Sequence, residues 1–297
     1  MPFRASFNCL WCGTAYVARG ADDIEGWAQL CPDCVAKAGD NGFLRFRLRD
    51  AITERGRAAV PANSARVSAT TPDVGDDQLV AYYEARAPEY DDWYLRRGRY
   101  ERGPIHDAAW NAELDAAGRW LDGLPISGQI VELAAGTGWW SPLLAGKGEL
   151  SIYDAAVAPL DRARDRLLAH GLRAHIHTRD AWAEPDRQVD ALFAGFWLSH
   201  VPRDRLGEFL AIARRWLRDG GTFAFIDSQQ DAQSGAGDHP TPTADRSIRR
   251  LDDGREFDIV KVYYTPEELE EALRAAGFAR AEVTATGRFF LLGRATA

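Results

Sequence analysis

A glycine-containing turn after an apolar run has the composition of a nucleotide-binding site. Ile130 and Val131 indicate the end of a buried strand, and Gly136 and Gly138 follow it. Glycine permits a tight turn and lets backbone N–H groups approach a ligand closely. A dinucleotide-binding turn has a further glycine three positions after its second one, where this chain has Ser141. The turn therefore predicts a nucleotide ligand of another kind.

Acidic residues end the first two predicted strands. Glu132 lies at the end of the strand before the turn, where its carboxylate would face an ammonium group rather than a pyrophosphate. Asp154 ends the predicted strand 150–154 and lies 16 residues after Gly138. A carboxylate at that strand end can accept hydrogen bonds from ribose hydroxyls. The two acids thus predict a ligand with a sugar and a free amino group.

The segment 132–138, Glu-Leu-Ala-Ala-Gly-Thr-Gly, resembles motif I of the class I S-adenosylmethionine (SAM) methyltransferases, and most of all their UbiE-like small-molecule group. Ala134 stands where many members have the first glycine. Residues 217–227 resemble the LxPGG turn of the class, with Asp219 in place of the proline. The resemblance implies an α/β fold with a Rossmann-like seven-stranded sheet, helices on both faces, and SAM as the cofactor.

The resemblance also implies which residues bind SAM. It places Tyr90 over the methyl end of the cofactor as a catalytic candidate, whereas packing between two helices is the alternative for each tyrosine. It implies that Asp180 binds the adenine amino group and that Trp182 packs against the ring. The implied cofactor-binding residues are Tyr83, Tyr90, Glu132, Ala134, Gly136, Gly138, Asp154, Ala155, Asp180, Ala181, Trp182 and Phe196.

His200 is the histidine whose position suggests chemistry. It follows the predicted fourth strand, and the carboxyl ends of parallel strands line the ligand crevice of such sheets. Methyl transfer holds donor and acceptor in line, and a base helps when the acceptor carries a proton. An intrinsic pKa of about 6.5 suits histidine to that task. The alternative is a capping or core histidine.

All four cysteines lie near the start of the chain, at Cys9, Cys12, Cys31 and Cys34. They form two CxxC pairs separated by 18 residues, a spacing typical of a four-thiolate zinc site. The alternative is two disulfides, which a reducing compartment disfavours. We expect a structural zinc ion in a zinc-ribbon-like domain over residues 1–58.

The rest of the chain reads as a linker and one large domain. Residues 59–76 are rich in Ser, Thr, Pro and Ala and are interpreted as the linker, and 77–297 as the methyltransferase-like domain. Pro88 is expected to interrupt a helix over 78–94. Residues 228–262 are predicted to form a lid and a hairpin, with Asp253-Gly254 as the hairpin turn. Thr265 is expected to cap a further helix.

Composition limits the possible partners. The formal net charge of −8 argues against a broad electrostatic grip on nucleic acid. No segment reaches the roughly 18 apolar residues of a membrane span, and the start lacks an apolar signal core, so we expect a cytoplasmic protein. The chain is long enough for a full hydrophobic core.

Three function classes follow from these patterns. The leading one is a methyltransferase acting on an N, O or C atom of a small molecule, with His200 as candidate base. The second is an RNA base methyltransferase, since rRNA guanine methyltransferases also join a zinc head to this fold. The third is a SAM-binding regulator without catalysis. The acids at 132, 154 and 180 do not discriminate among these classes.

The cysteine spacing leads to a direct prediction. Freshly purified, reduced protein should carry about one zinc ion per chain, because four thiolates complete a tetrahedral site. Elemental analysis measures this content. Protein prepared in the same way without any bound zinc would contradict the assignment of the four cysteines.

Overall fold

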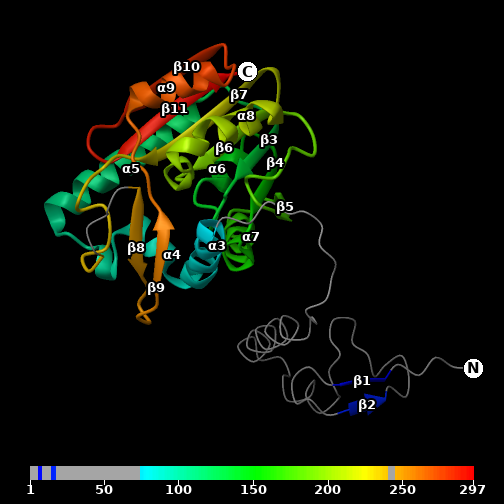
Figure 1. Cartoon of the computed structure of the whole chain (residues 1–297), viewed down its shortest axis with the longest axis vertical. Helices are drawn as coiled ribbons and strands as arrows, with labels where there is room; N and C mark the ends of the chain where they lie inside the picture. The colour runs from blue at the N-terminus through cyan, green and yellow to red at the C-terminus, as the bar shows by residue number, and fades with distance from the viewer. Residues whose placement is uncertain (1–5, 9–14, 18–73, 240–244) are drawn as a thin grey trace, which may run out of the picture. The chain divides into compact units, whose positions relative to one another are not determined.

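A computed structural model describes residues 6–8, 15–17, 74–239 and 245–297, and the chain divides into two units, Met1–Thr70 and Thr71–Ala297 (Figure 1). In the first unit, β1 (Ser6–Asn8) pairs antiparallel with β2 (Ala15–Val17). The four cysteines lie outside the described residues, as does the predicted zinc-ribbon domain apart from β1 and β2. The second unit carries the fold discussed below.

The second unit is built on a seven-stranded sheet with the order β10-β11-β7-β6-β3-β4-β5. Strands β7, β6, β3, β4 and β5 pair in parallel, and β11 pairs antiparallel with both β7 and β10. The predicted α/β class and seven-stranded sheet are confirmed. The strands are β3 (Gly128–Leu133), β4 (Gly148–Asp154), β5 (His175–Thr178), β6 (Val189–Gly195), β7 (Leu217–Ser228), β10 (Arg280–Ala285) and β11 (Phe290–Thr296).

Strand residues alternate between two apolar layers. In β7, Phe223 and Phe225 pack into a core shared with α8 and α9, whereas Ala224 and Ile226 pack into a core shared with α5, α6 and α7. Figure 1 shows α8 and α9 in front of the sheet and α5 behind it. The helices are α3 (Val74–Arg86), α4 (Tyr90–Leu95), α5 (Pro104–Gly123), α6 (Ser141–Ala145), α7 (Val157–Ala169), α8 (Leu206–Trp216) and α9 (Pro266–Ala275).

Local signals set several boundaries. A 3₁₀ turn at Ala87–Glu89 separates α3 from α4, as expected from Pro88, whose ring cannot continue an α-helix. Thr265 caps α9 in a capping box with Glu268, as its sequence predicts. None of the helices in the described parts of the chain has the length and apolarity needed to cross a membrane.

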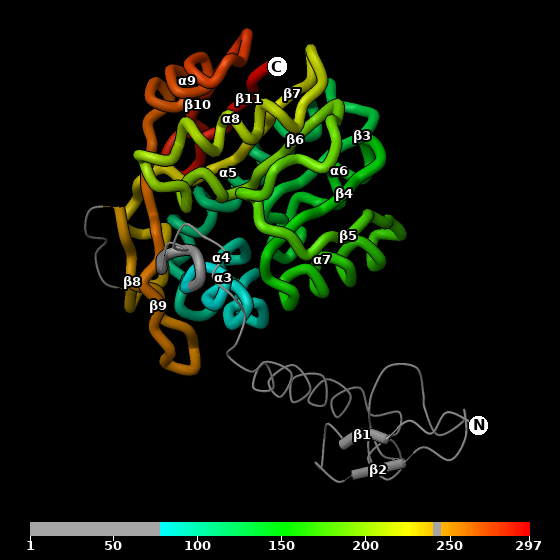
Figure 2. The backbone as a smooth tube through the Cα atoms, turned by 45° about the vertical axis from the view of Figure 1, so that its right-hand side comes forward, coloured from blue at the N-terminus to red at the C-terminus, as the bar shows by residue number. Residues whose placement is uncertain are grey.

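The predicted hairpin and the segment before it lie beside the first helices. Strands β8 (Arg246–Arg250) and β9 (Glu256–Val260) pair antiparallel, and Figure 2 shows this hairpin next to α3.

The described part of the predicted lid, 229–239, is held by arginines. Arg96 donates to the carbonyls of Gln233 and Ser234 at 2.9 and 3.0 Å, and Arg102 donates to that of Gly235 at 2.7 Å.

Two glycine substitutions should change stability in opposite directions. A Cβ on Gly293 in β11 would overlap the buried ring of Phe225 on β7, so Gly293→Ala should cost about 1–3 kcal/mol of unfolding free energy. Gly118 lies inside α5, where a Cβ would meet only Trp140 at 3.7 Å. Gly118→Ala should therefore stabilise the domain by about 0.5–1 kcal/mol. Urea unfolding measures both, and an unchanged midpoint for Gly293→Ala would contradict the packing of β11 on β7.

Candidate active site

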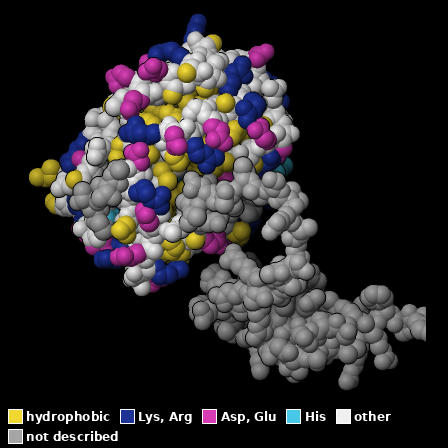
Figure 3. All heavy atoms as spheres, viewed as in Figure 1, with side chains coloured by type: hydrophobic (Ala, Val, Ile, Leu, Met, Phe, Trp, Pro, Cys, Tyr) yellow, Lys and Arg dark blue, Asp and Glu magenta, His cyan; other side chains and the backbone are white. Residues whose placement is uncertain are grey.

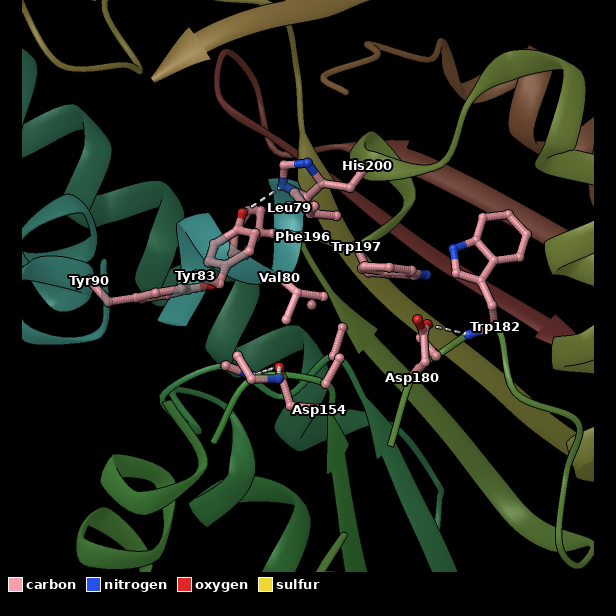
Figure 4. A pocket seen from close by; sticks show the side chains of 16 residues that line it. Leu79, Val80, Tyr83, Tyr90, Asp154, Asp180, Trp182, Phe196, Trp197 and His200 are labelled. Carbon is pink, nitrogen blue, oxygen red and sulfur yellow. Dashed lines mark hydrogen bonds between the residues drawn. The ribbon is translucent and has the colours of Figure 1, made fainter. Parts of the chain in front are cut away.

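A cavity opens at the carboxyl ends of β3, β4 and β6, where the strand order reverses. This first cavity, together with its open mouth, encloses about 590 Å³. Figure 4 shows its side chains, with Tyr83 and Tyr90 on one side and Asp180 and Trp182 on the other. The predicted residues that line it are Tyr83, Tyr90, Ala134, Gly136, Asp154, Ala155, Asp180, Ala181, Trp182, Phe196 and His200.

The turn after β3 needs its two glycines for different reasons. Gly136 has φ +55°, and a Cβ there would come within 3.1 Å of the Tyr90 hydroxyl beside the cavity. Gly138 has φ +70° and faces α7, where a Cβ would lie 2.7 Å from that of Ala163. Ala134 also adopts a left-handed conformation, with φ +50°, where most L-residues are strained. Gly138 thus allows α7 to approach the turn and does not line the cavity.

Asp154 links the ends of β3 and β4. Its Oδ2 accepts the Gly136 N–H and its Oδ1 accepts the Ala156 N–H, both at 2.8 Å. Burial raises the pKa of the Asp154 carboxyl to about 6, although these two backbone donors oppose the shift. Each oxygen keeps a lone pair for a further donor. Two neighbouring hydroxyl groups of a sugar fit this carboxylate.

Glu132 is not among the residues that line the cavity. The sequence suggested that its carboxylate faces the ligand; in the structure the side chain is buried, and its Oε2 accepts the hydroxyl of Ser141 at 2.5 Å. Burial raises the pKa of Glu132 to about 8. In this arrangement Glu132 fixes the start of α6 against β3.

The far end of the cavity combines an acid with a large ring. Asp180 accepts the backbone N–H of Trp182 at 2.9 Å through Oδ1, and this bond shapes the loop after β5. The Trp182 ring packs edge-on against Phe209, with ring centroids 5.6 Å apart, and the guanidinium of Arg205 lies 3.9 Å from its centroid. A flat heterocycle with an amino group fits between such groups.

His200 and Tyr83 form a hydrogen-bonded pair at the inner end. The Nδ1 of His200 lies 2.7 Å from the carbonyl oxygen of Val260, and its Nε2 lies 2.7 Å from the Tyr83 hydroxyl. Because a carbonyl only accepts, Nδ1 carries the proton and Nε2 accepts from Tyr83. Burial, followed by the charge of Lys261, holds the pKa of His200 well below its usual range. The imidazole is therefore neutral at pH 7, and Figure 4 shows its bond to Tyr83.

A second cavity of about 580 Å³ adjoins the first. The two share Tyr83, Tyr90, Phe196 and His200, which we call the shared wall. Basic side chains of α3, β8 and the segment after β9 line the second cavity. These residues form no local sequence motif, so the sequence did not predict the second cavity. Sequence reasoning also missed the residues Leu79, Val80, Ala156 and Gly195 of the first cavity. They are small or apolar groups without a chemical signature, and Leu79 and Val80 come from a helix before motif I.

Comparisons with known proteins agree with this geometry. The family model "Methyltransferase domain" matches residues 130–221. The structure of DhpI in a complex with SAM and HEP is 32% identical, covers 76% of this chain and 99% of that chain, and has a TM-score of 0.61. The complex of DhpI with SAH is also 32% identical; it covers 75% of this chain and 98% of that chain, and has a TM-score of 0.59.

A more distant structure shares the fold. The 1,6-didemethyltoxoflavin-N1-methyltransferase of Burkholderia thailandensis is 16% identical, covers 80% of this chain and 97% of that chain, and has a TM-score of 0.50. The comparison with curated protein sequences finds no match. The strand order, the glycine turn, the carboxylate of Asp154 and the 32% identity over almost the whole of DhpI lead to one assignment: this chain belongs to the SAM-dependent methyltransferases.

Proposed function

We propose that this enzyme transfers the methyl group of SAM to a small molecule held in the second cavity. The observation that supports this proposal is the shared wall, where the first cavity adjoins a second space of similar volume. The complex of DhpI contains HEP in addition to SAM, which supports a second ligand beside the donor. Transfer across the shared wall requires the two ligands to meet near Tyr90 and Phe196.

The first cavity suits SAM from end to end. Asp154 would accept the ribose hydroxyls, and Asp180 with Trp182 would hold the adenine. Bound SAM supplies a methyl group on a positively charged sulfur, and the acids of this cavity favour such a cation. Tyr90 and Phe196 would then line the path of the methyl group and hold donor and acceptor in line.

The Tyr83–His200 pair offers an exit for the acceptor's proton. With SAM bound, the lone pair of the acceptor atom would form the new bond to the methyl carbon, and the electrons of the carbon–sulfur bond would pass to sulfur. The acceptor's proton would pass to the Tyr83 hydroxyl, while the Tyr83 proton passes to His200 Nε2. His200 would thus act as a base through Tyr83 and not by direct contact.

A small acceptor fits the surface better than RNA. Figure 3 shows acidic and basic side chains interspersed over the face that it views, and the formal net charge is −8. SAM consumption measured against small-molecule pools and RNA pools tests the proposal. Turnover only with RNA would favour the nucleic-acid alternative, and no turnover with either would favour a SAM-binding regulator.

We further propose that the four cysteines hold zinc. This proposal rests on their spacing alone.

Binding of SAH should depend on the charge of Asp154. The ionised carboxylate accepts both ribose hydroxyls, so affinity should be full above about pH 6 and fall by up to about tenfold per unit below it. Asp154→Asn should weaken SAH roughly 10- to 100-fold and remove this pH dependence. Calorimetry measures both, with Asp161→Asn, a half-exposed acid on α7 outside both cavities, as the matched control. Equal affinity of wild type and Asp154→Asn at pH 7 would refute the ribose assignment.

Removing the Tyr83 hydroxyl should slow turnover without loosening the donor. With an acceptor from the screen, Tyr83→Phe and His200→Ala should each lower kcat about a hundredfold and leave the Kd of SAH nearly unchanged. The double variant should be no slower than either single one, because both act in one proton path. Tyr94→Phe, which removes a hydroxyl outside both cavities, is the control. Full turnover of Tyr83→Phe would exclude the proton path.

A further inference from the structure

Three cationic side chains converge on the second cavity from separate elements. Arg86 ends α3, Arg249 lies on β8, and Lys261 follows β9. Among the described residues, neither Asp nor Glu lines this space. The first cavity shows the opposite pattern, since Asp154 and Asp180 line it without Lys or Arg. The two sides of the shared wall therefore differ in charge.

Arg86 is a buried cation without an anion. Its side chain is enclosed by tyrosine rings, with the ring centroids of Tyr90 and Tyr82 at 4.7 and 5.5 Å from the guanidinium carbon. It contacts the Tyr100 hydroxyl at 3.5 Å, but its buried Nε has no hydrogen-bond partner. It forms no ion pair with the part of the chain that the structure describes. A guanidinium keeps its charge at any working pH, and aromatic contact replaces its lost hydration only in part.

Lys261 is also buried and only partly satisfied. Its Nζ donates to the hydroxyls of Ser199 and Ser228 at 2.7 and 3.3 Å, which leaves a third proton for another acceptor. The nearest negative charge acting on it is Asp227, whose oxygens already accept the backbone N–H groups of Ser199 and Ser228. Burial lowers the pKa of Lys261 to about 8, so the ammonium form still predominates at pH 7.

Arg249 is held in place by a neutral histidine. His239 Nε2 lies 3.1 Å from the carbonyl oxygen of Arg250 and must donate to it, so Nδ1 accepts from Arg249 Nη1 at 3.1 Å. Burial, followed by the charge of Arg249, lowers the pKa of His239 to about 4. The histidine therefore orients the guanidinium without neutralising it. Arg249 also forms a hydrogen bond with the side chain of Tyr263, and both residues line the cavity.

We propose that the methyl acceptor carries a compact oxyanion, a carboxylate, phosphate or phosphonate group, and that Arg86, Arg249 and Lys261 bind it. The inference rests on the proposed function and adds the substrate class. A planar or tetrahedral oxyanion supplies several acceptor atoms to guanidinium and ammonium donors at once. The atom to be methylated then lies at the shared wall, next to Tyr83 and Tyr90.

Binding of such an anion would also act on His200. Lys261, Arg249 and Arg86 all hold the pKa of the imidazole down in the free protein. An anion among these cations offsets their field, which makes the imidazole a better acceptor for the Tyr83 proton. Binding of the acceptor would thus itself offset the positive charge that opposes proton transfer to His200.

Calorimetry on the full-length protein saturated with SAH tests the oxyanion site. The probes are methylphosphonate, inorganic phosphate and acetate, with acetamide as the uncharged counterpart of acetate. We expect at least one anion to bind and acetamide not to bind. Arg249→Gln and Lys261→Met should each weaken that anion at least about tenfold. Arg246→Gln, on the same strand but paired with Asp258 outside the cavity, should leave it unchanged.

The same titrations separate two kinds of failure. The oxyanion site is refuted if SAH binds normally and no anion gives heat. It is also refuted if Arg249→Gln and Lys261→Met leave the affinity for the anions unchanged. In both cases the methyltransferase function stands. If SAH itself gives no heat, the proposed function fails first. A turnover screen with acids and their matching amides adds a kinetic arm, in which preference for the amides would overturn the proposal. Phosphonates, phosphates and carboxylates tested separately identify which oxyanion is bound.

Discussion

The hydrogen bond between Tyr83 and His200 is the contact on which the two cavities depend. It joins α3, before the first strand of the large sheet, to the loop after β6, and so closes the shared wall. The bond is directional because Val260 fixes the imidazole tautomer from the other side. Both residues line both cavities, so the bond lies where the two spaces adjoin. One buried polar pair thus connects the surroundings of the two cavities.

The two cavities differ in charge. Asp154 and Asp180 line the first, whereas Arg86, Arg249 and Lys261 line the second. In the proposed reaction, these opposite fields would favour the cationic donor in the first cavity and an anionic acceptor in the second.

Much of the sheet and of the donor cavity could be predicted from sequence, because their signals are local. Gly136 and Gly138 mark the turn, and Asp154 ends a strand that can be recognised from its apolar residues. The role of Glu132 could not be judged in this way. Its residue type and strand position suit a ligand contact, but its partner, Ser141, and its depth depend on how α6 packs against β3. The zinc site of the four cysteines in the zinc-ribbon-like domain remains a prediction.

The second cavity could not be foreseen for a different reason. Arg86 and Lys261 lie far apart in the sequence, and neither belongs to a motif that marks a binding site: Arg86 ends a polar helix, and Lys261 interrupts an apolar run. Only the docking of the β8–β9 hairpin beside α3 brings them to one space and removes them from water. A buried cation without a carboxylate is costly, whereas the surface arginines pair with acids, as Arg246 does with Asp258. That contrast between Arg246 and the buried Arg86 and Lys261 distinguishes a surface ion pair from a buried cation, and it arises only in three dimensions.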